Sequence, residues 1–88
     1  MLEIILVESD FRSPAEVHEF LADELDFPGY YGQNLAALWD CLGDLDDPVR
    51  FIVSRADDAG GRSDWFDRLV TVLLRADDQL DVVETIVR

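Results

Sequence analysis

The sequence has few of the residues that crosslink a chain, bind metals or perform acid–base chemistry. Its 88 residues include one cysteine, Cys41, and one histidine, His18. A single cysteine excludes an intramolecular disulfide, and a thiol beside Leu38 and Leu42 on a helix is expected to be buried and inert. A lone histidine without a second ligand nearby predicts a surface side chain rather than a metal ligand or a catalytic base. We expect no metal and no cofactor.

Recognisable catalytic motifs are missing as well. The sequence contains no paired nucleophile and base, no HExxH or CxxC motif and no glycine-rich phosphate loop. The acidic segment 43–48 lacks the spacing of a calcium-binding loop and is expected to be solvated. These absences argue against an enzyme.

Long apolar runs are also absent. No stretch approaches the roughly 20 apolar residues that span a bilayer. The first residues lack the basic segment and the long apolar run of a signal peptide. We expect a soluble, cytoplasmic protein that does not contact membranes, and the length fits one domain over residues 1–88.

Positive charge is scarce. Seven basic residues stand against twenty acidic ones, which gives a formal net charge of −13. Such a surface repels nucleic acid and anionic membranes, so a strong partner is expected to be basic. Acidity that only keeps the protein soluble explains the charge equally well at this point.

Three short apolar segments alternate with segments of helical periodicity. Residues 2–7, 49–54 and 82–87 are predicted to be strands, the first of them buried. Parallel strands need crossovers of a dozen or more residues, and the helical segments between them supply these. The sequence therefore predicts an α/β fold with a small three-stranded parallel sheet and crossover helices.

The first and last helical segments have clear start signals and one apolar face each. Ser13 and Glu16 form a capping box around Pro14. Residues 56–62 are expected to be a loop with a short helical turn, after which Ser63 caps the last helix. The residues expected to be buried are Val17, Phe20, Leu21 and Leu25 in the first helix and Phe66, Leu69, Val70, Leu73 and Leu74 in the last.

The middle helix is predicted from Asn34, which can cap it, to Gly43, which is expected at the position just past its end. An apolar stripe of Leu35, Leu38 and Leu42 faces the core.

The opposite face of this helix is exposed. At about 100° per residue, Ala36 and Asp40 share it, with Trp39 on its flank. Trp39 can serve as a contact or as part of the core. Asp40 has no role in a core, so it is expected to be a binding residue or a solvated acid.

The run YYGQNLAALWDCL, residues 30–42, resembles the barstar family, whose members are intracellular inhibitors of secreted ribonucleases of the barnase type. The resemblance implies one barstar-like domain, monomeric when free, that blocks the active site of a basic, guanyl-specific nuclease in a 1:1 complex. Its carboxylates would take the place of RNA phosphate, with Asp40 as the anchor. Gly32 would contact the nuclease or provide a backbone conformation that a side chain does not allow. The residues that the resemblance places at or beside the interface are Tyr30, Gly32, Asn34, Leu35, Ala36, Trp39, Asp40, Gly43, Asp44 and Asp77.

Two positions depart from the family pattern. The family pattern has an acid where this chain has Ala36, one turn before Asp40. It has another acid late in a helix, where this chain has Ala76 followed by Asp77 and Asp78, and Asp77 could replace that acid after a small shift. Asp44 and Asp46 carry acidity in the loop after the helix. A related nuclease with a different arrangement of basic residues is one reading. The alternative is an acidic interaction or toxin-immunity module that binds another basic protein through the same helix.

Overall fold

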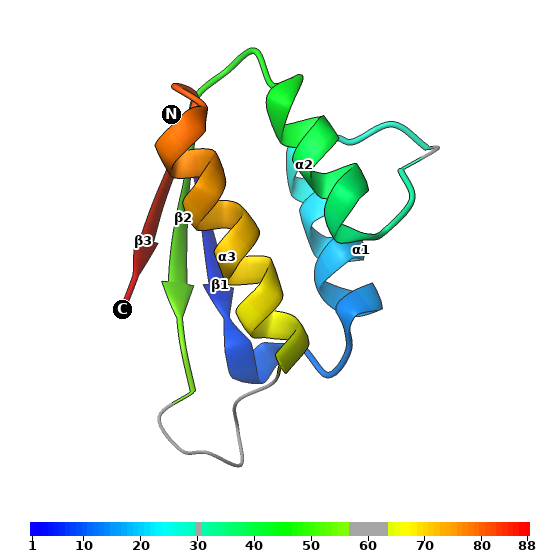
Figure 1. Ribbon diagram of the computed structural model, residues 1–88. Helices are drawn as coiled ribbons and strands as arrows, with labels where there is room; N and C mark the ends of the chain where they lie inside the picture. Colours follow the sequence, from blue (N-terminus) through cyan, green and yellow to red (C-terminus); the bar gives the residue numbers. More distant parts are fainter. Residues whose placement is uncertain (30, 57–63) are drawn as a thin grey trace.

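The computed structural model describes residues 1–29, 31–56 and 64–88 (Figure 1). Tyr30 lies outside the described residues. So do the predicted cap Ser63 and, except for Ala56, the predicted turn in 56–62. No helix in the described part is long and apolar enough to cross a membrane. The elements are β1 (Leu2–Val7), a 3-10 turn η1 (Glu8–Asp10), α1 (Pro14–Leu25), α2 (Leu35–Gly43), β2 (Val49–Ser54), α3 (Asp64–Gln79) and β3 (Val83–Val87).

The three strands form one parallel sheet in the order β1-β2-β3, which confirms the predicted α/β fold. In Figure 1, α3 runs across the sheet, and α2 packs against α3. Ile4 and Leu6 of β1 are buried, whereas Ile5 between them is 59% exposed. The prediction of a buried first strand was therefore wrong for one face, because the helices cover only the other face.

Local signals in the sequence set the start of α1. The Ser13 hydroxyl accepts a hydrogen bond from the Glu16 N–H at 3.4 Å, and Pro14 is the first helical residue. The Glu16 carboxylate reaches back to the N–H of Arg12 at 2.5 Å, one residue earlier than in a regular capping box. Asp26, with φ of 55°, ends the helix in the left-handed region.

The face of α3 that packs on the sheet is rotated slightly from the predicted one. Leu74 is 45% exposed, and Ala76 is completely buried. At 100° per residue, Leu74 lies about 90° from the centre of the apolar stripe, so its prediction as a core residue was wrong. The other predicted residues of this stripe, Phe66, Leu69, Val70 and Leu73, are buried.

A buried ion pair joins the carboxyl ends of β1 and β2. Glu8 is 2% exposed and accepts hydrogen bonds from Arg55 Nε at 2.8 Å and from the Ala56 N–H at 3.0 Å. Arg55 also pairs with Asp67 at the start of α3, and its guanidinium lies 5.6 Å from the centre of the Phe66 ring. This cluster holds two strands and a helix together at one end of the sheet.

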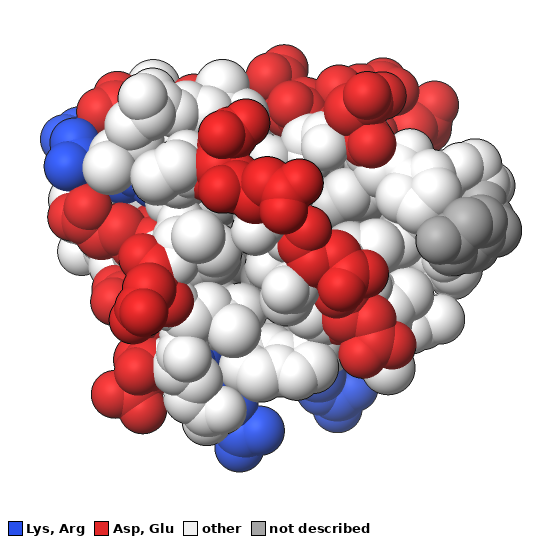
Figure 2. All heavy atoms as spheres, turned by 90° about the horizontal axis from the view of Figure 1, so that it is seen from above, with Lys and Arg blue, Asp and Glu red and all other residues white. Residues whose placement is uncertain are grey.

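The opposite end of the molecule carries mostly acid. Figure 2 shows rows of Asp and Glu side chains there, with uncharged atoms between them and basic residues at the margin. The candidate binding site lies at this end of the molecule.

Candidate protein-binding site

Asn34 fixes the start of α2. Its side-chain oxygen accepts a hydrogen bond from the Ala37 N–H at 2.8 Å, as predicted for an N-cap, and its amide nitrogen donates to the Gly32 carbonyl at 3.3 Å. The left-handed residue before the helix is Gln33, with φ of 53°, and not Gly32. A Cβ on Gly32 would lie 3.0 Å from Asn34 Nδ2. The glycine therefore provides space beside the cap rather than an unusual φ.

The end of α2 differs from the prediction. Gly43 is the last helical residue, and Asp44 caps the helix with ordinary right-handed angles. The Asp44 N–H donates to the Cys41 carbonyl at 3.2 Å, so a tight turn closes the helix without a left-handed glycine. The prediction that Gly43 lies just past the end of the helix was therefore wrong.

The two faces of α2 are placed as the helical spacing predicts. Leu38 and Leu42 are fully buried, and Leu35 is half-buried. Ala36 and Asp40 are exposed on the opposite face. Within the part of the chain that the structure describes, the side chain of Asp40 makes no hydrogen bond or ion pair, so its carboxylate is available to a partner.

Trp39 is half-buried beside Asp40. One part of its ring packs against the core cluster, and the remainder reaches solvent. The side chain thus belongs to both environments that the sequence left open. An aromatic side chain held by the core therefore lies next to an exposed carboxylate on α2.

His18 of α1 is buried, so its prediction as a surface residue was wrong. It is 3% exposed, and its Nδ1 lies 2.5 Å from the Tyr31 hydroxyl, which satisfies the imidazole away from water. The Tyr31 ring also packs on Phe27, with 4.9 Å between ring centres. Burial lowers the pKa of His18 and raises the pKa of Tyr31, the latter with a further contribution from Cys41. Tyr31 therefore anchors the loop before α2 to α1.

The buried histidine predicts that stability falls in weak acid. The pKa of His18 is lower in the folded than in the unfolded protein, so the fold favours the neutral imidazole. The stability that depends on this neutral form is complete above about pH 6.5 and is lost as the pH falls below that value. The free energy of unfolding should then decrease by at most about 1.4 kcal/mol per pH unit from this group. Urea unfolding between pH 5 and 8 measures the effect. His18→Gln should flatten the dependence near pH 6, and an unchanged slope would contradict the assignment.

Cys41 is half-buried and lines a groove, whereas a fully buried thiol was predicted. Burial raises the pKa of the Cys41 thiol, and the negative charges of Asp44 and Asp40 raise it further by smaller amounts. The group therefore remains a protonated thiol near neutral pH, which makes it a poor nucleophile.

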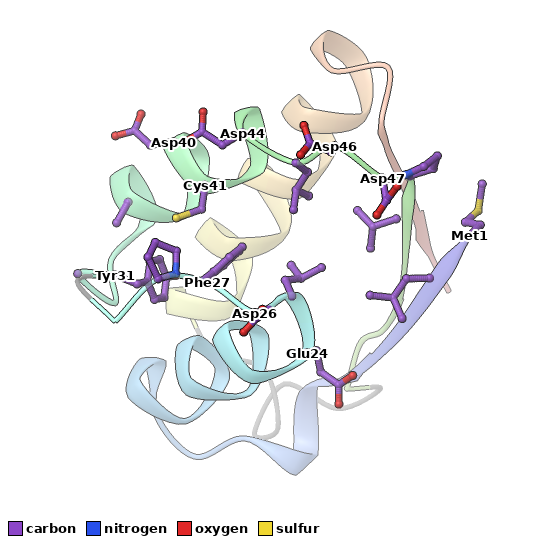
Figure 3. A pocket seen from close by; sticks show the side chains of 18 residues that line it. Met1, Glu24, Asp26, Phe27, Tyr31, Asp40, Cys41, Asp44, Asp46 and Asp47 are labelled. Carbon is purple, nitrogen blue, oxygen red and sulfur yellow. The ribbon is translucent and has the colours of Figure 1, made fainter.

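The groove lies between α2 and the end of α1 and has a volume of about 910 Å³. Figure 3 shows Asp40 and Asp44 along one side of it, with Asp26 and Glu24 across from them and Phe27 and Cys41 between. Its lining also includes Tyr31, Gly32 and the loop residues Leu45, Asp46 and Asp47.

The candidate residues are not all brought to this groove. Gly32, Asp40 and Asp44 line it, whereas Asn34 and Leu35 line a smaller cleft of about 240 Å³ with Trp65. The structure places Asp77 beside β3, where its carboxylate accepts a hydrogen bond from the Thr85 N–H at 2.9 Å. Tyr30 lies outside the described residues.

Several acids of the groove were missed. Glu24 and Asp26 come from the end of α1, which the sequence assigned only to packing, and Asp47 comes from a loop that was expected to be solvated. The sequence signal that could have indicated them is the pair of acids at the end of α1, Glu24 and Asp26. Nothing local indicated that the chain reversal after Leu25 would place these side chains opposite α2.

Comparison with known proteins identifies the family of the chain. The family model described as "Barstar (barnase inhibitor)" matches residues 1–87. The chain belongs to the barstar family. A curated relative, "Putative ribonuclease inhibitor YrdF" of Bacillus subtilis (strain 168), is 48% identical over 54 residues, which is 60% of this chain. The match spans 59% of the length of that relative. The resemblance predicted from residues 30–42 is confirmed.

Proposed function

We propose that the protein inhibits a secreted, guanyl-specific microbial ribonuclease by covering its active site with the loop before α2 and with α2 itself, in a 1:1 complex. The observation that carries the proposal is Asp40, an exposed and unpaired carboxylate beside a half-buried Trp39 on a capped helix. A carboxylate so placed can occupy the position of an RNA phosphate among the nuclease's cationic side chains. Family membership and the name of the Bacillus relative support the same role.

Inhibition by occupancy needs no chemistry from the inhibitor. A net charge of −13 attracts a cationic nuclease over several ångströms and accelerates encounter. The free Asp40 then pairs with cations in a site from which the complex excludes water, where charged hydrogen bonds are strong.

A titration tests the proposal. Increasing amounts of the purified protein are added to a fixed concentration of barnase and of several related guanyl-specific enzymes, and RNA cleavage is measured. For at least one enzyme, RNA cleavage should fall in proportion to the added protein and should be fully suppressed at one equivalent. If every enzyme keeps full activity in excess protein, ribonuclease inhibition of this kind is excluded.

A second candidate is an acidic module that binds a different basic protein through α2, for example as the immunity partner of a toxin. The observation that favours it is Ala36, exposed where the family pattern has an acid. Capture on the immobilised protein, with identification of the bound chains, separates the two functions. Recovery of one non-nuclease basic protein, and of no nuclease, would favour the second.

Restoring the missing acid should strengthen inhibition of barnase. Position 36 is exposed and one turn before Asp40, so an aspartate there would add a second carboxylate to the same face. We expect Ala36→Asp to tighten the complex by about 1.5–3 kcal/mol, the range for hydrogen bonds to charged groups. Inhibition constants for wild type, Ala36→Asp and the uncharged control Ala36→Asn measure it. Equal constants for the two variants would show that charge at this position plays no part.

A further inference from the structure

The groove beside α2 extends beyond the helix face that inhibition by Asp40 would use. Its apolar part is formed by Leu25, Phe27 and Leu45, which are half-buried, and by Val49, which is 2% exposed. These side chains come from the end of α1, the segment after it, the loop between α2 and β2, and β2 itself. Apolar surface in a hollow of this size is available to a partner's side chain.

Acidic side chains stand along two sides of the groove, with Tyr31 at one end and Met1 at the other (Figure 3). Six of the side chains that line it are carboxylates and none is an arginine or a histidine, although Met1, with its terminal ammonium group, also lines it. Within the described residues none of the six takes part in a hydrogen bond or an ion pair, in contrast to Glu3, Glu8 and Glu84, which all pair with arginine. No side chain of the groove therefore supplies a cation to these carboxylates, and a cationic partner can do so. The rim residues are Glu24, Asp26, Asp40, Asp44, Asp46 and Asp47.

We propose that the groove receives a second segment of the target nuclease, a loop or chain end in which basic residues flank an apolar one. The inference rests on the proposed function, because Asp40 and Asp44 form a wall that the groove shares with α2. The apolar floor takes the central side chain, and the acids on both sides take its cationic neighbours. A nuclease that lacks this segment leaves Glu24 and Asp26 without partners.

Other occupants fit the same features less well. A second copy of this chain, an anionic lipid surface or RNA would be repelled by six unpaired carboxylates on a chain of charge −13. In the described part of the chain no three acids are grouped so as to hold a metal ion. A cationic polypeptide with an apolar side chain satisfies both the rim and the floor.

The first test needs no nuclease. The blocked hexapeptide Arg-Arg-Leu-Leu-Arg-Arg and its counterpart with two glycines in place of the leucines are titrated into the ¹⁵N-labelled protein. We expect saturable shifts at the amides of Asp26, Phe27 and Leu45, with an affinity about tenfold higher for the leucine peptide, because burial of a leucine is worth at least that much. Shifts spread over all acidic segments, or equal affinities for the two peptides, would overturn the groove as a site for such a segment.

The second test uses a nuclease that the activity titration shows to be inhibited, with a matched pair of double variants in α1 and at the residue that ends it. Glu24→Gln/Asp26→Asn removes two charges from the groove, and Glu19→Gln/Asp23→Asn removes two exposed charges of the same helix outside it. The groove variant should lose at least about tenfold more affinity than the control and should show the weaker dependence on salt. If both variants bind that nuclease equally well, the nuclease does not use the groove, although inhibition through α2 stands. If the activity titration finds no nuclease that the protein inhibits, the proposed function and this use of the groove are both refuted. The peptide titration then still decides whether the groove binds a basic segment with an apolar centre.

Discussion

Replacing Asp40 with alanine should weaken inhibition of the target ribonuclease by about 2–5 kcal/mol, or roughly 30- to 5,000-fold in the inhibition constant. The residue is exposed and unpaired in the free protein, so the substitution removes nothing that the fold needs. In the complex, the same change leaves the nuclease's cations buried against an apolar methyl group, and their lost solvation accounts for much of the effect. The barstar family is itself among the systems on which this range is based.

The Asp40 experiment needs a control for charge. Asp23→Ala removes one exposed acid from α1, outside the groove, and should change the inhibition constant only slightly. Both variants should unfold at the same denaturant concentration as the wild type. An Asp40→Ala constant within about 1 kcal/mol of the wild-type value would place the anchor elsewhere, since a change of that size is typical of a contact at the rim.

Local features of the sequence predicted the fold well. The strands at 2–7 and 49–54 have the expected bounds, and the third begins one residue later than expected. The side chains of Ser13 and Asn34 accept hydrogen bonds from the N–H groups three residues later in the chain. The capping residue and the N–H that it caps therefore lie in the same short segment. The face of α2 was predictable for the same reason, because helical spacing alone places Asp40 opposite Leu38 and Leu42.

Features that depend on distant partners were not predictable in this way. His18 is buried because Tyr31, thirteen residues later, supplies its hydrogen bond. Cys41 reaches a groove that exists only because the chain reverses after α1. Gly32 is next to the left-handed Gln33, and its need for space depends on the position of the Asn34 amide. The face of Asp40 was thus visible in the sequence, whereas the groove beside it was not.

Glu8 is the strongest case of a residue whose role depends on distant parts of the chain. An acid directly after an apolar strand is expected to be solvated, yet this side chain is 1% exposed and pairs with Arg55, 47 residues away. The Arg55 side chain is itself 13% exposed, so both members of the pair are largely removed from water. Such a pair adds little net stability compared with apolar residues, but removal of one partner leaves the other charge buried and uncompensated.

Glu8→Ala should therefore lower the free energy of unfolding by about 3–5 kcal/mol. Among the described residues, the substitution removes the acceptor of the hydrogen bonds from Arg55 Nε and from the Ala56 N–H, although Asp67 still pairs with the arginine. Glu8→Gln keeps an acceptor oxygen and loses only the charge, so its loss should be smaller. Urea unfolding at neutral pH measures the series.

Glu3→Ala provides the comparison for that series, because Glu3 also pairs with an arginine of β2, but its side chain is 50% exposed and that of Arg50 is 33% exposed. Water can solvate Arg50 after this change, and Glu84 remains bonded to it, so the loss should be much smaller than for Glu8→Ala. Equal losses for Glu3→Ala and Glu8→Ala would mean that burial does not control the strength of these pairs. A large loss confined to Glu8 would instead show that the fold depends on the buried pair between the ends of β1 and β2, at the end of the sheet opposite the acidic groove.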